Sequence, residues 1–214
     1  MLKHCSLGTI LRSGLKFNSY IQIVVIIFLL TGAYLFVFKE VQLSGDDLWF
    51  LNIDLENLSE YLNTRWQGWS SRLGLELVLF FCLHNFFLFR IILFLIVLST
   101  PLLVLKFFRI SYNLENYLVF ALTLFLFDYH ILSTAGWVTT ITHYLFPFYA
   151  FITAKILIDS KNTLKIFLSA PILAYACNQE LVALLSLAFF FFQFFQKKYI
   201  RQEDQLVYVS VLPI

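Results

Sequence analysis

The sequence predicts an all-α protein, a polytopic bundle of transmembrane helices with an outer-face loop and an interfacial helix between the first two crossings. Of its 214 residues, 60% are hydrophobic and 13% are charged, whereas a soluble domain is about half apolar and a quarter charged. The mean hydropathy is +0.81, and a single soluble core of this size could not bury so much apolar surface. The apolar residues also form long blocks separated by short polar stretches, as several membrane crossings require. We therefore expect one integral membrane domain over residues 1–214, located in the cell membrane.

Charge and cysteine content argue against a nucleic-acid-binding protein and against a framework of disulfides or cysteine-bound metal. The 15 basic and 13 acidic residues leave a net charge of only +2, so we expect no nucleic-acid partner. The three cysteines lie in separate segments without the spacing of metal ligands, which predicts free thiols and no metal site. They are Cys5, Cys82 and Cys177.

The first crossing is predicted near residues 20–38. Three basic residues and no acidic residue precede it: Lys3, Arg12 and Lys16. Because positive charge favours the cytoplasmic side, we expect a cytoplasmic N-terminus and a multi-pass topology that starts from it. The run resembles a signal sequence but has no small-residue cleavage site, so an uncleaved helix is predicted. An acid-rich polar segment follows on the outer face, and the loop plus interfacial helix together span 39–86.

The block 73–108 has two interpretations. In the first, residues 71–86 lie as a helix in the outer interface and 87–105 cross the membrane, with Arg90 extending outward. In the second, the block is a tight hairpin of two crossings with Arg90 at the inner turn. The first interpretation is favoured because it leaves the later basic clusters on the cytoplasmic side.

Further crossings are predicted near 115–130, 144–158, 166–177 and 181–195. The last two could instead form one long tilted helix. Two short helices are preferred because they place Glu180 at the outer surface, and a carboxylate in the middle of a bilayer is unfavourable. The apolar run 206–214 is expected to begin another helix, so we expect the chain to be truncated at its C-terminus.

Polar and aromatic residues from four separate outer segments are predicted to form one site at the membrane surface. Each also has an ordinary explanation: aspartates are common in solvated turns, and Trp and Tyr are common at membrane interfaces. Glu180 is harder to explain in this way, because it lies between two apolar runs. The candidate residues are Asp46, Asp47, Arg65, Trp69, Arg72, Trp137, His143, Tyr144, Asn178 and Glu180.

Four motifs in this order resemble the N-terminal part of GT-C superfamily glycosyltransferases. They are Gly45-Asp46-Asp47-Leu48-Trp49-Phe50, Tyr61…Trp66…Trp69-Ser70-Ser71-Arg72, Ala135-Gly136-Trp137…His143-Tyr144-Leu145-Phe146-Pro147 and Asn178-Gln179-Glu180. The closer resemblance is to bacterial GT-C-like membrane proteins related to glucosyltransferases that modify surface polysaccharides. It covers about residues 15–200, with Ser71 standing where a glycine commonly precedes the arginine. Proteins of this kind have many more crossings.

The resemblance implies an enzyme that transfers a sugar from a polyprenyl-phosphate donor to a cell-surface glycan or lipid acceptor. One of Asp46 and Asp47 would then be the catalytic base. Arg72, with Arg65 as second choice, would bind the phosphate through its planar, permanently charged guanidinium. The remaining candidates would bind substrate: Trp69, Trp137, His143, Tyr144, Asn178 and Glu180. No metal ligands are assigned and the cofactor is unknown, with a divalent cation left open as one option.

Three alternatives stay open at this stage. A transporter or flippase component would also be helical, but its polar residues should lie near the middle of the bilayer. A membrane acyltransferase could use His143 or His130 as its base, although His143 is expected in a loop. A non-catalytic multi-pass membrane protein is the third. The sequence does not identify the sugar, the acceptor or the oligomeric state.

Overall fold

The computed structural model describes residues 19–38, 43–68, 72–126, 135–160 and 162–210. These residues form helices and connecting segments, with no strand among them. The prediction of an all-α chain is therefore confirmed. The helices are α2 (Ser19–Phe38), α3 (Asp46–Leu51), η1 (Leu55–Asn57), α4 (Leu58–Gly68), α5 (Leu73–His84), α6 (Phe86–Phe107), α7 (Leu114–Leu126), α8 (Trp137–Thr140), η2 (Ile141–Leu145), α9 (Phe146–Asp159), α10 (Thr163–Ala176) and α11 (Glu180–Ser210).

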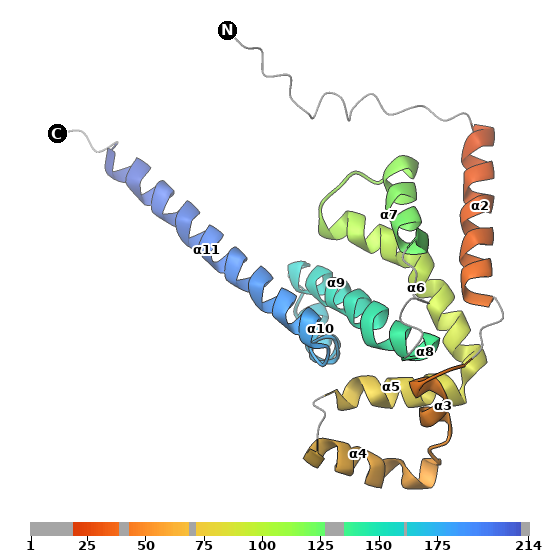
Figure 1. Cartoon of the computed structure of the whole chain (residues 1–214). Helices are drawn as coiled ribbons and strands as arrows, with labels where there is room; N and C mark the ends of the chain where they lie inside the picture. The colour runs from red at the N-terminus through yellow and green to blue at the C-terminus, as the bar shows by residue number, and fades with distance from the viewer. Residues whose placement is uncertain (1–18, 39–42, 69–71, 127–134, 161, 211–214) are drawn as a thin grey trace.

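The helices divide into a bundle and a group that lies across one end of it (Figure 1). In the bundle, α6 packs against α2, α7 and α9, and α9 packs against α10. At the lower end in Figure 1, α4 and α5 run across the end of the bundle where α6 begins, with α3 beside α5. The helix α11 starts next to α10 and extends away from the bundle.

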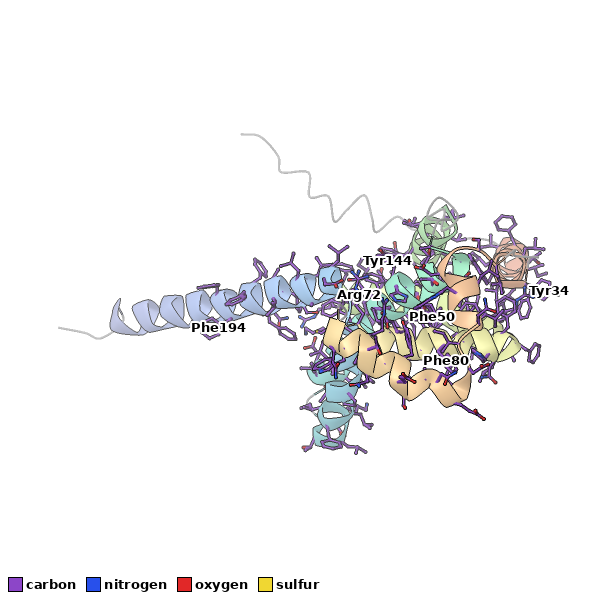
Figure 2. All side chains as sticks on the ribbon, turned by 60° about the horizontal axis from the view of Figure 1, so that its bottom comes forward. Tyr34, Phe50, Arg72, Phe80, Tyr144 and Phe194 are labelled. Carbon is purple, nitrogen blue, oxygen red and sulfur yellow. The ribbon has the colours of Figure 1, made fainter. Side chains whose placement is uncertain are left out.

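Two helical stretches are long and apolar enough to cross a membrane. They are Phe86–Phe107 and the continuous stretch Trp137–Asp159, which comprises α8, η2 and α9. Large apolar side chains are also exposed on several helices, among them Phe28 on α2 and Phe167 on α10. Phe194 on α11 is another, and Figure 2 shows it away from the bundle. Exposed apolar surface of this kind suits contact with lipid. The full set of crossings and the side of the N-terminus remain predictions.

The block 73–108 is divided at Asn85, where the backbone leaves the helical conformation with φ −127° and ψ 56°. Arg90 lies inside α6, so the structure has no turn there. The break between α5 and α6 therefore lies at Asn85, and not at Arg90 as the hairpin interpretation requires. Helix α5 runs across the end of the bundle (Figure 1), and its place in a membrane interface stays a prediction.

The helix expected to start at residue 144 begins earlier, at Trp137. His143, expected in a loop, is consequently inside the helix and buried. The reason is a contact distant in sequence, described below, in which a side chain from α3 caps this helix. The apolar spacing of the sequence could not reveal that contact.

Two other boundaries concern the C-terminal third. The chain leaves the helix after Ala176 and starts α11 at Glu180, so 166–195 is divided where two short helices were preferred. Residues 206–210 continue α11 instead of beginning a new helix, because no turn or helix-breaking residue interrupts them. Cys5 and His130 lie outside the described residues, while Cys82 and Cys177 are free thiols.

Candidate functional site

A cavity of about 580 Å³ lies where α3, α4, α5, the α8–η2 helix and the start of α11 meet. Six of the predicted site residues line it: Asp46, Arg65, Arg72, His143, Tyr144 and Glu180. The other lining residues are Trp49, Phe50, Glu76, Ala135, Thr139 and Thr140. Figure 2 shows three of the lining side chains, Phe50, Arg72 and Tyr144, in one region of the molecule. Segments far apart in the sequence thus contribute charged and aromatic groups to one space.

Asp47 lies behind the cavity wall and caps the helix that starts at Trp137. Its Oδ1 accepts hydrogen bonds from the backbone N–H of Thr139 at 2.8 Å and from the Thr139 hydroxyl at 2.7 Å. Its Oδ2 accepts from the backbone N–H of Val138 at 3.2 Å. First-turn N–H groups have no partner within their own helix, and a carboxylate is well suited to them. Burial raises the pKa of Asp47, and these hydrogen bonds partly oppose that shift.

Gly136 makes this cap possible. Its φ is +92°, a conformation that side chains with a Cβ rarely adopt, and a Cβ there would lie 2.4 Å from Asp47 Cγ. Only glycine accommodates both the backbone turn and the approach of the carboxylate. The Ala135-Gly136-Trp137 motif therefore has a structural role in joining α3 to α8.

Asp46, the preceding residue, has a different environment. It is exposed at the start of α3 and lines the cavity. Consecutive residues on a helix point about 100° apart, which separates the two carboxylates. The cavity therefore contains one of the two aspartates, while the other is occupied by helix capping.

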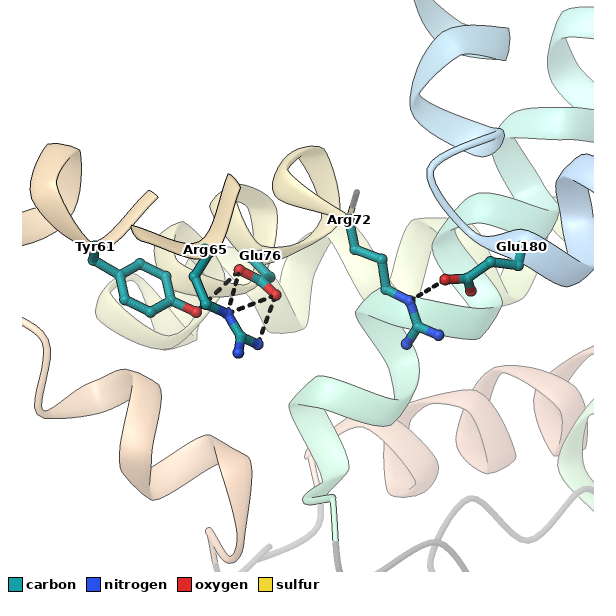
Figure 3. Close-up of polar contacts among 5 residues, drawn as sticks. All are labelled: Tyr61, Arg65, Arg72, Glu76 and Glu180. Atoms are coloured by element: carbon teal, nitrogen blue, oxygen red, sulfur yellow. Dashed lines mark hydrogen bonds and ion pairs between the residues drawn. The ribbon is translucent and has the colours of Figure 1, made fainter. Parts of the chain in front are cut away.

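Two arginine–glutamate pairs lie at the cavity, and in the first, Arg65–Glu76, the carboxylate is buried. Arg65 Nη2 donates to Glu76 Oε1 at 2.8 Å, and Arg65 Nε lies 3.2 Å from both carboxylate oxygens (Figure 3). Tyr61 donates its hydroxyl to Glu76 Oε2 at 3.0 Å. Glu76 has 3% of its side chain exposed, and its hydrogen bonds raise the pKa of Arg65. Trp49 adds an aromatic face, with the Arg65 guanidinium 5.7 Å from its ring centroid.

The second pair joins the beginnings of α5 and α11. Arg72 Nε donates to Glu180 Oε1 at 2.7 Å, and Figure 3 shows the guanidinium groups of Arg65 and Arg72 pointing to the same side. Close by, the backbone N–H of Gly74 donates to Asn178 Oδ1 at 3.2 Å. Asn178 therefore connects two segments and does not line the cavity.

His143 lies in a stretch of π-helix that ends two residues before Pro147. In this register the carbonyl of Thr142 would accept from the backbone nitrogen of residue 147, which as proline carries no hydrogen. The hydroxyl of Tyr175 donates to that carbonyl instead, at 3.4 Å. His143 Nδ1 donates to the carbonyl of Thr139 at 2.9 Å, which assigns the lone pair to Nε2. This atom is on the ring edge away from that contact and can accept a hydrogen bond.

The two tryptophans predicted to bind sugar are not in the described lining of the cavity. Trp137 is buried and packs edge-on against Phe89, with ring centroids 5.5 Å apart. Trp69 lies outside the described residues. Trp49 and Tyr144 supply the exposed aromatic faces of the cavity instead.

Sequence reasoning did not select Glu76 and Tyr61 as part of this site. Glu76 interrupts an apolar block, and a carboxylate in such a place needs a charged or hydrogen-bonding partner. That signal could have identified it as a partner for one of the arginines. Within the described part of the chain, no group of three or more His, Cys, Asp or Glu side chains is arranged to hold a metal ion.

No protein-family model, curated protein or solved structure matches this chain.

Proposed function

We propose that the chain is a membrane glycosyltransferase-like protein that transfers a sugar from a polyprenyl-phosphate donor to a glycan or lipid acceptor outside the cytoplasm. The observation that carries this proposal is the cavity that contains Asp46, Arg65, Arg72 and His143 together. A carboxylate and two guanidinium groups in one space are the groups that sugar transfer from a lipid phosphate requires.

In the proposed reaction the acceptor hydroxyl attacks the anomeric carbon of the donor. A new carbon–oxygen bond forms, the bond between the anomeric carbon and the phosphate oxygen breaks, and the configuration inverts. Asp46 takes the proton of the hydroxyl, since Asp47 is buried and occupied by its three hydrogen bonds. The lipid phosphate leaves as an anion, and the guanidinium of Arg72 stabilises the charge that develops on it. His143 Nε2 would accept a hydrogen bond from a sugar hydroxyl.

A second cavity supports a substrate with a lipid chain. It has a volume of about 460 Å³, is bounded by residues of α6, α7, η2, α9 and α11, and shares Tyr144 with the first. Its lining is largely apolar, including Pro101, Phe120 and Phe148. An isoprenoid chain could occupy this space while its phosphate lies near Arg72.

The proposed topology places the first cavity at the outer membrane surface. The six crossings start from a cytoplasmic N-terminus, and α5 lies in the outer interface beside the headgroups. Arg72, directly before α5, is then at the level of lipid phosphates. Engineered cysteines at positions 46 and 72 should react with an impermeant thiol reagent added from outside.

The test of this function is the variant Asp46→Asn. Membranes that contain the wild-type chain should transfer label from a radioactive polyprenyl-phosphate sugar, and the variant should lose at least about 100-fold in rate. Glu56→Gln is the matched control, because Glu56 is exposed on η1 and does not line the cavity. The assay uses a panel of donor sugars. Unchanged transfer by Asp46→Asn, or no transfer by the wild type with any donor, would contradict the proposal.

A further inference from the structure

The two arginine–glutamate pairs of the cavity differ in how easily each can be separated. Glu76 is 3% exposed and receives hydrogen bonds from Arg65 and Tyr61. Arg72 and Glu180 are 42% and 56% exposed, and Nε of Arg72 donates to Glu180. Removing a partner from a buried pair is strongly unfavourable, whereas an exposed pair contributes little to stability. If a ligand replaces a carboxylate, the structure favours the replacement of Glu180.

We propose that Glu180 is a displaceable counter-ion for Arg72, and that a phosphoryl group entering the cavity takes its place on the guanidinium. This inference rests on the proposed function, which assigns Arg72 to a phosphate. The exchange breaks the hydrogen bond between Arg72 Nε and Glu180 Oε1, and phosphoryl oxygens accept from the guanidinium instead. Glu180, already half-exposed, turns to water.

The charge of the cavity supports an exchange over simple addition of an anion. Three carboxylates line it, those of Asp46, Glu76 and Glu180, against the two guanidinium groups of Arg65 and Arg72. Another anion added to this set would be repelled, because the carboxylates already outnumber the cations. Departure of Glu180 removes one negative charge from the cavity, and a phosphoryl group offers oxygens that match the planar donors of the guanidinium.

The exchange also reaches the start of α11. The contacts between this region and α5 include the Arg72–Glu180 pair and the hydrogen bond from Gly74 N–H to Asn178 Oδ1. The backbone of Gly74 lies close to the side chain of Asn178, since a Cβ at residue 74 would lie 3.2 Å from Asn178 Oδ1. Loss of the first contact leaves the beginning of α11 less constrained. Its first-turn N–H groups, those of Val182 and Ala183, donate to Gln179 and would exchange hydrogen faster.

Binding to the purified full chain in lipid nanodiscs tests the exchange. The probes are inorganic phosphate, farnesyl phosphate and uncharged farnesol. We expect Glu180→Gln to bind the two phosphates about two- to fivefold more tightly than the wild type, and Arg72→Gln to lose this binding. Glu56→Gln removes the same charge outside the cavity and should bind as the wild type does.

Removal of a negative charge could tighten anion binding without any displacement, so a second measurement is needed. In the wild type, phosphate binding should accelerate hydrogen exchange at Val182 and Ala183. In Glu180→Ala, which has no side-chain oxygen to accept from Arg72, exchange at these amides should already be fast and should not change on binding. Binding of both phosphates would show that the phosphoryl group suffices, and binding of farnesyl phosphate alone would identify a lipid headgroup as the ligand.

Three results would overturn the proposal: no binding of either phosphate, equal affinity in the wild type and Glu180→Gln, or unchanged exchange at α11 when phosphate binds. These measurements need no sugar transfer. A loss of the proposed function in the Asp46 test and a failure of the partner exchange are therefore separate results.

Discussion

Asp46 and Asp47 are adjacent and chemically identical, yet the fold gives them different surroundings. Asp46 is exposed and lines the cavity. Asp47 is fully buried and accepts hydrogen bonds from Val138 and Thr139 at the start of another helix. Because both belong to the short helix α3, the rotation of about 100° per residue directs one carboxylate to the cavity and the other into the bundle.

The comparison shows that a pair of acids need not work as a pair. Asp47 holds α3 against the helix that carries His143, and so fixes the wall of the cavity on which Asp46 lies. Removal of Asp47 should act mainly on folding, whereas removal of Asp46 should act mainly on chemistry. Measurements of stability can therefore separate the two residues without knowledge of the substrate.

The largest expected difference is between Asp47→Ala and Asp46→Ala. The first leaves the buried N–H groups of Val138 and Thr139 and the Thr139 hydroxyl without their acceptor, so unfolding should become easier by about 3–4 kcal/mol. The second removes an exposed side chain and should change stability by less than about 0.5 kcal/mol. Denaturant unfolding in detergent, followed by circular dichroism, measures both. Equal loss of stability in the two variants would refute the division of roles.

Gly136→Ala attacks the same cap from the other side. The new Cβ would be forced into a backbone conformation with φ +92° and would overlap the Asp47 carboxylate. We expect a loss of about 2–3 kcal/mol in unfolding free energy. Gly68→Ala is the matched control, because no atom lies within 4 Å of a Cβ at that position. A Gly136→Ala variant as stable as this control would mean that the close approach to Asp47 is not required.

The sequence predicted those features of the fold that depend on residues near one another in the chain, and it did not predict those that depend on contacts between distant residues. Apolar blocks are local, so the helical class and the division near residues 177–179 follow from composition and spacing. The early start of the helix at Trp137 depends on Asp47, which lies 91 residues before its hydrogen-bond partner Val138 in the chain. No pattern around residue 137 contains that information.

The candidate site shows the same limit. Residue types and their predicted side of the membrane brought together Asp46, Arg72, His143 and Glu180. The sequence did not predict which acid pairs with which arginine. Arg65 pairs with Glu76, and in the sequence Glu76 was noted only as an interruption of an apolar block. Trp137 resembled a ligand-binding aromatic residue but is buried in the core, because capping at Asp47 draws its segment inward.

The smallest expected effect is the pH dependence of stability that Asp47 contributes. Burial raises its pKa in the folded protein above the ordinary value of 3.8, so the folded state holds this proton more tightly than the unfolded state does. Stability should therefore fall as the pH rises from about 4 through the raised pKa, and be independent of pH below this window for this group. The difference in unfolding free energy between the wild type and Asp47→Asn, measured from pH 3 to 7, isolates the contribution because other titrating groups are common to both. A difference that is constant with pH, or one that grows in favour of the wild type as the pH rises, would show that the hydrogen bonds from Val138 and Thr139 outweigh the burial of the carboxylate.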